Sequence, residues 1–353
     1  MELIALGFDS WFEDHAKELV KPEQSIARVI AVDRGRCIVN DGFREISAVL
    51  LGKYLHEIES PADFPCVGDW VSVEHHDSDA FASIHAILQR KTLLRRKTAG
   101  REIEFQMIAA NIDTAFIVQS CRFDFNIRRL ERYLVMVNEG QIEPLILLTK
   151  TDLISPDELE LLMANIRSAG INTQIIALSN VTGSGIEQVR ALMAAGKTYC
   201  LLGSSGVGKT TLINRLVGKA ELETKSVSAT GEGRHTTTRR QLIMLEDGAM
   251  LIDMPGMREL GMVGDSEGID ESFSDVVELI ANCRFADCSH SNEPGCAILM
   301  AIENGELSED HFQNYLKLNK ESDFYQMSHH EKRKKDKAFG RHIKSVMKHR
   351  DKY

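Results

Sequence analysis

The stretch that decides the fold is Gly203-Ser204-Ser205-Gly206-Val207-Gly208-Lys209-Thr210, a complete G-x-x-x-x-G-K-[ST] loop. An apolar run at 199–202 precedes it, and we expect a helix to begin near Lys209. This phosphate-binding motif requires a strand before the loop and a helix after it. Gly206 and Gly208 let the backbone wrap an anion, so that N–H groups and the helix N-terminus face the phosphates. A chance glycine-rich turn is the alternative, which the fit of every position and both flanks disfavours.

A second phosphate-side motif lies downstream, where Asp253-Met254-Pro255-Gly256 follows an apolar segment and matches D-x-x-G. In such sites the loop lysine reaches the β- and γ-phosphates, and the loop threonine ligates Mg²⁺. The aspartate holds Mg²⁺ through water, and the glycine N–H senses the γ-phosphate. We therefore expect Lys209 to be catalytic and Thr210 to bind magnesium. The predicted contacts with the phosphates of a bound nucleotide are Gly203, Ser204, Ser205, Gly206, Val207, Gly208, Lys209, Thr210, Thr211, Asp253 and Gly256.

A base-reading motif, Thr149-Lys150-Thr151-Asp152, follows the apolar segment 145–148. An aspartate at its fourth position can accept hydrogen bonds from guanine N1–H and the 2-amino group, which adenine does not offer in that arrangement. The aliphatic stem of Lys150 can cover the ring face, and Thr149 stands where asparagine is usual. We predict that Thr149, Lys150, Thr151 and Asp152 bind the guanine of GTP. The segment Ser179-Asn180 and the loop after it are a less specific candidate for contact with guanine O6.

The order of these motifs is reversed. In an ordinary GTP-binding domain the phosphate loop comes first and the base-reading motif last, whereas here 149–152 precede 203–210. From about 105 to 260, apolar strands alternate with amphipathic helices, which predicts an α/β sheet with helices on its faces. The sequence therefore predicts a circularly permuted P-loop GTPase domain.

The residue after the D-x-x-G glycine is Met257, where Ras-like enzymes place the glutamine that orients the attacking water. A methionine cannot do this. The segment 231–239 lies where the first switch loop belongs, and His235 within it is the best local candidate for ordering water. We predict a catalytic role for His235. The alternatives are that His235 is a solvent-exposed loop residue and that the Mg²⁺ and phosphate geometry, or a partner, positions the water.

Four metal-binding side chains follow in the spacing Cys283-x4-Cys288-x-His290-x5-Cys296. Three thiolates and one imidazole form a tetrahedral zinc set with no open position, which is typical of a structural ion rather than a catalytic one. The alternative is a group of buried thiols. We expect one structural Zn²⁺ per chain, besides the Mg²⁺ that accompanies GTP.

Composition bounds the class of protein. A formal net charge of −10 over 353 residues argues against a protein that coats nucleic acid with its whole surface. The segment 332–352 is rich in lysine and arginine and predicts contact of one end with a polyanion, although a solvated helical face is the alternative. No secretory pattern opens the chain, and no apolar run approaches the roughly 18–20 residues that span a membrane. Because the scattered cysteines fit a reducing compartment, we expect a cytoplasmic protein. We also expect a monomer that makes no contact with a membrane.

The order of predicted strands and helices along the chain predicts a multidomain α/β protein. Short β-segments between about 25 and 100 indicate an OB-like β-barrel, with a β-rich cap of another kind as the alternative. We expect an N-terminal extension and OB-fold domain at 1–104 and the circularly permuted GTPase domain at 105–278. A zinc-binding α-rich module with a basic C-terminal helix is expected at 279–353.

The motifs TKTD, GSSGVGKTT, GRHTTT, DMPG and C-x4-C-x-H-x5-C, in this order, resemble the RsgA family, also called YjeQ or YloQ. The resemblance covers nearly the whole chain. It implies an OB-fold, a circularly permuted GTPase domain and a C-terminal zinc module. It also implies a role in late maturation of the small ribosomal subunit and contact with its rRNA, with hydrolysis of GTP to GDP and phosphate stimulated by that subunit. The departures are ALSN at 177–180, where an S-A pair is common, and the acidic N-terminal extension.

Two other readings of the motifs stay open. One is a zinc-containing nucleic-acid-binding module whose phosphate loop acts as a ligand-gated switch without meaningful turnover. The other is a P-loop kinase or ATPase, which the motif at 149–152 and the lack of an evident acceptor site disfavour.

Overall fold

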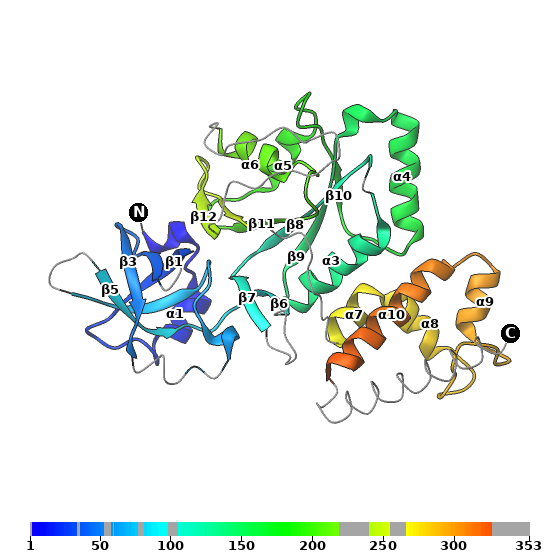
Figure 1. Ribbon diagram of the computed structural model, residues 1–353, viewed down its shortest axis with the longest axis horizontal. Helices are drawn as coiled ribbons and strands as arrows, with labels where there is room; N and C mark the ends of the chain where they lie inside the picture. The colour runs from blue at the N-terminus through cyan, green and yellow to red at the C-terminus, as the bar shows by residue number, and fades with distance from the viewer. Residues whose placement is uncertain are drawn as a thin grey trace, which may run out of the picture.

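The computed structural model describes residues 2–33, 36–52, 58, 60–76, 81–97, 105–123, 125–218, 240–254 and 266–326. Figure 1 shows a β-rich part near the N-terminus, a central sheet flanked by helices, and a helical part toward the C-terminus. The predicted multidomain α/β arrangement is confirmed. Within the described ranges, no helix is both long and apolar enough to cross a membrane.

The N-terminal strands close into a barrel. They follow the order β1-β2-β3-β5-β4, and β4 pairs again with β1. Buried Val29, Val39, Val71 and Ile84 fill the interior, because alternate residues of each strand point inward. The predicted OB-like barrel is therefore confirmed. Its strands are β1 (Ser25–Asp33), β2 (Arg36–Asn40), β3 (Glu45–Leu50), β4 (Trp70–His75) and β5 (Phe81–Ile87).

Short elements surround the barrel and lead out of it. Phe12 of the first helix packs with Leu6, Trp70 and Leu88 in one apolar cluster, so the N-terminal extension closes an end of the barrel. Asp9 caps this helix by accepting from the backbone N–H groups of Trp11 and Phe12, which satisfies donors that the helix leaves open. These elements are η1 (Leu3–Leu6), α1 (Ser10–Ala16), η2 (Pro61–Asp63) and the hairpin β6 (Leu93–Lys97) with β7 (Phe105–Ala110).

The central sheet follows the order β10-β9-β8-β11-β13-β12, with β12 antiparallel and the other strands parallel. Two apolar clusters, one on each face, bury its strands against helices, as expected for parallel sheets. The strands are β8 (Thr114–Ser120), β9 (Glu143–Thr149), β10 (Ile175–Ala177), β11 (Thr198–Leu202), β12 (Arg240–Met244) and β13 (Met250–Asp253). The helices are α3 (Ile127–Glu139), α4 (Pro156–Ser168), α5 (Ile186–Leu192) and α6 (Lys209–Val217).

The helical part packs around its own core, in which Phe273, Val276, Ile298 and Phe312 are buried. Val135 of α3 belongs to the same cluster, which joins this core to the central domain. The helices are α7 (Ser266–Ser272), α8 (Ser274–Ala281), α9 (Ala297–Glu303) and α10 (Glu309–Gln326). Because α7 and α8 share this core, they pack as part of the C-terminal helical unit.

A buried imidazole fixes α10 onto the central domain. His311 Nδ1 lies 2.5 Å from Glu131 Oε1 on α3, and Nε2 lies 3.2 Å from Asp275 Oδ1 on α8. Asn314 Nδ2 donates to the other Glu131 oxygen at 2.5 Å. Burial disfavours the charged imidazole, but Asp275 and Glu131 outweigh it and raise the pKa of His311 to about 9. His311 is therefore a cation held between two carboxylates.

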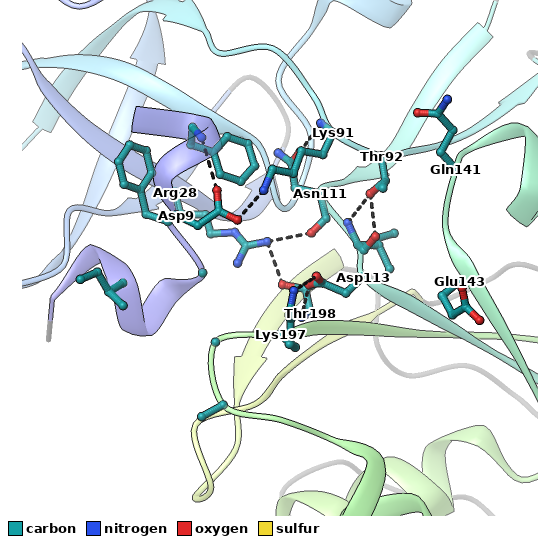
Figure 2. Close-up of a pocket in the computed structure, with 17 residues that line it drawn as sticks. Asp9, Arg28, Lys91, Thr92, Asn111, Asp113, Gln141, Glu143, Lys197 and Thr198 are labelled. Carbon is teal, nitrogen blue, oxygen red and sulfur yellow. Dashed lines mark hydrogen bonds and ion pairs between the residues drawn. The ribbon is translucent and has the colours of Figure 1, made fainter. Parts of the chain in front are cut away.

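Arg28 of β1 joins three parts of the chain at the seam between barrel and central sheet (Figure 2). Its buried guanidinium donates to Leu6 O, to Asn111 O at 3.1 Å and to Thr198 Oγ1 at 2.9 Å. Burial lowers the pKa of Arg28 to about 10, and the Asp113 carboxylate opposes this effect, so Arg28 stays charged at neutral pH. A cavity of about 450 Å³ lies beside these contacts. The seam is therefore held by charge-assisted hydrogen bonds as well as by the β1–β12 pairing.

Candidate functional site

The phosphate loop leaves the central strand β11 at Leu202 and enters α6 at Lys209, the strand–loop–helix context expected from the sequence. Gly203 has φ 151°, and a β-carbon there would lie 2.3 Å from Val118 O on the neighbouring strand. Gly208, with φ 100°, is the N-cap of α6. Both positions require glycine, because a side chain at 203 would collide with β8 and the backbone at 208 is left-handed. Thr210 and Thr211 lie exposed in the first turn of α6.

Lys209 curls back over its own loop. Its Nζ donates to Gly203 O at 2.7 Å and to Ser204 O at 2.6 Å. An ammonium carries three protons. Among the described residues, the loop takes two of them, which leaves one for an anion. Burial lowers the pKa of Lys209 to about 8, and Asp253 at the end of β13 opposes this effect. A phosphate beside Nζ would favour the charged form, so the lysine is prepared for an anionic ligand.

Asp253 lies across from this lysine and is largely buried. Burial raises the pKa of its carboxyl group, and the Lys209 ammonium opposes the rise. Carboxylate and hydroxyl oxygens are ligands that Mg²⁺ prefers. Thr210 and Asp253 are therefore the right donor types for magnesium. Thr210 lies in the first turn of α6, which the phosphate loop joins to β11, and Asp253 ends the neighbouring strand β13.

The base-reading motif is tied to the phosphate loop although 58 residues separate the bonded pair. Thr149 ends β9, and its buried Oγ1 donates to Val207 O at 2.6 Å, with Gln119 O 3.2 Å away. Lys150 follows with φ 60°, which turns the chain out of the strand into η3 (Thr151–Leu153). The base-reading motif and the phosphate loop are therefore held side by side.

Asp152 lies exposed in η3, as a residue that meets a ligand should. Ser179 Oγ donates to Asp152 Oδ1 at 2.5 Å, which orients the carboxylate. The same Ser179 hydroxyl accepts from the N–H groups of Val181 and Thr182. The 179–185 loop, the weaker candidate in the sequence, therefore lies against the base-reading motif and positions its aspartate.

One contact was not predicted from the sequence. Arg129, in the first turn of α3, donates from Nη1 to Ser204 Oγ of the phosphate loop at 2.7 Å. The chain has many arginines, and nothing in the local pattern around 129 distinguishes this one. Only the parallel pairing of β8 with β11 places the start of α3 beside the phosphate loop.

Several predicted residues lie outside the described residues. These are His235 and the segment 231–239, Gly256 and Met257 after Asp253, and the basic segment 332–352. Their roles stay predictions from the sequence.

The four predicted zinc ligands come together. Ligand atoms of Cys283, Cys288, His290 and Cys296 all lie within 4.8 Å of one another. His290 Nδ1 is 3.6 Å from Cys283 Sγ and 3.5 Å from Cys296 Sγ. Tetrahedral zinc with bonds of about 2.3 Å to sulfur and about 2.0–2.1 Å to nitrogen separates such atoms by roughly 3.6 Å. The residues therefore fit a zinc ion, and a set of four protein ligands leaves no open coordination position for a substrate.

Comparisons with known proteins agree with this geometry. Residues 87–263 match the sequence profile of the RsgA GTPase family. The chain is 38% identical over 331 residues to "Small ribosomal subunit biogenesis GTPase RsgA" of Opitutus terrae, covering 91% of this chain and 90% of that protein. YjeQ from Thermotoga maritima superposes with a TM-score of 0.64 at 26% identity, covering 85% of this chain and 98% of the other.

A further crystal structure, of YloQ, shares the fold with a TM-score of 0.59 at 24% identity, covering 87% of this chain and 98% of YloQ. YloQ is described as a circularly permuted GTPase, which is the arrangement predicted here from the reversed motif order. The match of the profile across the permuted motifs and the extent of the sequence identity agree. The chain therefore belongs to the RsgA family of circularly permuted GTPases.

Proposed function

We propose that this GTPase binds the small ribosomal subunit and assists its late maturation, with hydrolysis of GTP to GDP and phosphate stimulated by that subunit. The names of its relatives, small ribosomal subunit biogenesis GTPases, support the partner. The 2.6 Å bond from Thr149 Oγ1 to Val207 O carries the nucleotide assignment, because it places a base-reading motif against a phosphate loop.

The roles of the site residues follow from their positions. We assign guanine binding to Lys150, Thr151 and Asp152, with Thr149 holding their motif against the phosphate loop, and phosphate binding to the 203–211 loop. Lys209 is held by Gly203 O and Ser204 O with one proton left over, so it can stabilise charge that develops on the phosphates in the transition state. Asp253 and Gly256 complete the phosphate side. Thr210 would hold Mg²⁺, which neutralises phosphate charge.

The water-positioning role is assigned to His235, supported by its place in the first switch loop and by Met257 in the position of the usual glutamine. In this proposal the isolated protein hydrolyses GTP slowly. Binding of the small subunit raises the rate by acting on the 231–239 segment.

We further propose a barrel domain at 1–104, a GTPase domain that begins at 105, and a zinc module that begins before α7 (Ser266–Ser272) rather than at 279. The closed barrel and the central sheet support the first two. The shared core of α7, α8 and α10 favours counting α7 and α8 with the zinc module. The barrel and the basic segment 332–352 would contact rRNA. One Zn²⁺ would be held by Cys283, Cys288, His290 and Cys296. A ribosomal partner favours a cytoplasmic location. We expect the free protein to be a monomer.

The test is the rate of GTP hydrolysis by the full chain as purified small subunits are added. We expect a slow basal rate and a saturable increase, whereas large subunits should leave the rate unchanged. Single-turnover measurement of GTP hydrolysis separates this proposal from a binding module without turnover. Such a module would release GTP unchanged in the presence of small subunits. Binding of ATP as tightly as GTP would contradict the base assignment.

A further inference from the structure

The base-reading motif of this chain lacks one donor. A carboxamide at the first motif position could bond the phosphate loop and still offer an N–H to the base. Thr149 offers a single hydroxyl proton, and Val207 O takes it at 2.6 Å. Thr149 is also fully buried beneath the phosphate loop. It therefore fastens the two loops together and has no proton left for guanine.

Guanine has two polar edges that need different partners. Its N1–H and 2-amino groups are donors, which suit the Asp152 carboxylate. Its N7 and O6 are acceptors, whereas adenine shows N7 as an acceptor and its 6-amino group as a donor on the same edge. An N–H group beside N7 and O6 therefore favours guanine, and a base held by Asp152 turns this edge away from η3.

The side chain of Asn180 lies on the phosphate-loop side of the base-reading motif. Its Nδ2 donates to Gly208 O at 3.0 Å, one residue beyond the carbonyl that Thr149 contacts. Because a carbonyl can only accept, this bond fixes which end of the carboxamide faces the loop. The two bonds to Val207 O and Gly208 O therefore tie the ends of β9 and β10 to the same part of the phosphate loop.

The protein uses the Asn180 carboxamide only in part. Nδ2 carries two protons, and among the described residues one of them is bonded, to Gly208 O. Oδ1 is buried and has no hydrogen-bond partner in the described part of the chain. Oδ1 can pair only with a donor, whereas the second proton of Nδ2 can pair with an acceptor. Because Gly208 belongs to the phosphate loop, this proton is the part of the carboxamide that can meet an acceptor on the base of a bound nucleotide.

We propose that Asn180 is a base-binding residue whose Nδ2 donates its second proton to N7 of guanine, replacing the donor that Thr149 cannot supply. The proposal rests on the GTP site proposed above. Asn180 then has two tasks, because it fastens the 179–185 loop to Gly208 and reads the edge of the base that Asp152 does not reach.

The test compares GDP with 7-deaza-GDP, in which a C–H group replaces N7, in competition binding to the full chain. One neutral hydrogen bond contributes about 0.5–1.5 kcal/mol, so the wild type should bind 7-deaza-GDP roughly two- to twelvefold more weakly than GDP. Asn180→Ala should bind both nucleotides equally. Its loss of the Gly208 contact weakens both alike and cancels in the ratio. Asn165→Ala, on the exposed face of α4, should keep the wild-type ratio.

Two outcomes overturn the proposal: a wild-type ratio of one, or a ratio that Asn180→Ala leaves unchanged. The first applies even if Asn180→Ala fails to fold. In both cases tight binding of GDP over ADP by the wild type shows that the GTP site itself stands. Failure of the wild type to prefer GDP over ADP would instead remove the GTP site on which the proposal rests.

Discussion

Replacing Asp152 with asparagine tests the base assignment most directly, because the structure says which way the new carboxamide points. Ser179 Oγ donates to Asp152 Oδ1 at 2.5 Å and needs an acceptor there. In Asp152→Asn the carbonyl end therefore stays toward Ser179, and the NH₂ group takes the position that faces the base. A donor then meets the guanine N1–H and 2-amino donors.

The expected cost is the loss of a charge-assisted hydrogen bond, about 1.5–3 kcal/mol, once the base covers the aspartate. This corresponds to a roughly 10- to 150-fold weaker affinity for GDP. Xanthine carries a carbonyl in place of the 2-amino group and can accept from the new NH₂. Asp152→Asn should therefore bind XDP more tightly than the wild type does.

Competition binding of GDP and XDP measures both effects. Asp157→Asn is the matched control, because Asp157 is an exposed aspartate in the first turn of α4 and its substitution removes the same charge. Affinity of Asp152→Asn for GDP within twofold of the wild type, or no gain for XDP, would refute the assignment of Asp152 to the base.

Three further predictions concern metal, catalysis and pH. Protein purified without chelators should contain about one zinc per chain, and metal analysis that finds no zinc would contradict this. Because a small module depends on its metal for folding, removal of the metal should unfold the region after about 278. GDP binding should stay largely intact. His235→Ala should reduce the subunit-stimulated rate of GTP hydrolysis far more than the affinity for GTP, since water alignment matters in the transition state. Lost affinity with an unchanged stimulated rate would reassign His235 to binding. No effect on either quantity would leave it an exposed loop residue. The pKa of His311, raised to about 9, exceeds the value of about 6.5 expected in the unfolded chain. The stabilisation by His311 should therefore be complete below about pH 6.5 and lost as the pH rises through about 9. Denaturant unfolding of wild type and His311→Gln checks this, and a stability difference that is the same at both ends of this range would count against it.

The local sequence determined the parts of this protein that depend on a few neighbouring residues. Three short segments each indicate the kind of ligand that they bind: the phosphate loop 203–210, the 149–152 motif and the cysteine–histidine cluster at 283–296. The alternation of apolar strands and helices predicted an α/β sheet with helices on its faces, because hydrophobic periodicity is set by neighbouring residues. Motif order alone predicted the permutation. The OB-like barrel was the weaker expectation, since short strands do not state how they pair.

Tertiary structure decided everything that joins distant segments. The bonds from Thr149 to Val207, from Asn180 to Gly208 and from Arg129 to Ser204 depend on which strands are neighbours in the sheet, and no local pattern encodes that. The contacts of His311 on α10 with Glu131 on α3 and Asp275 on α8 likewise depend on the packing of these three helices against one another. A single polar side chain has the same appearance in the sequence whether it is solvated or bonded across the fold. Its role here follows from burial and from the partner that the fold brings within hydrogen-bonding distance.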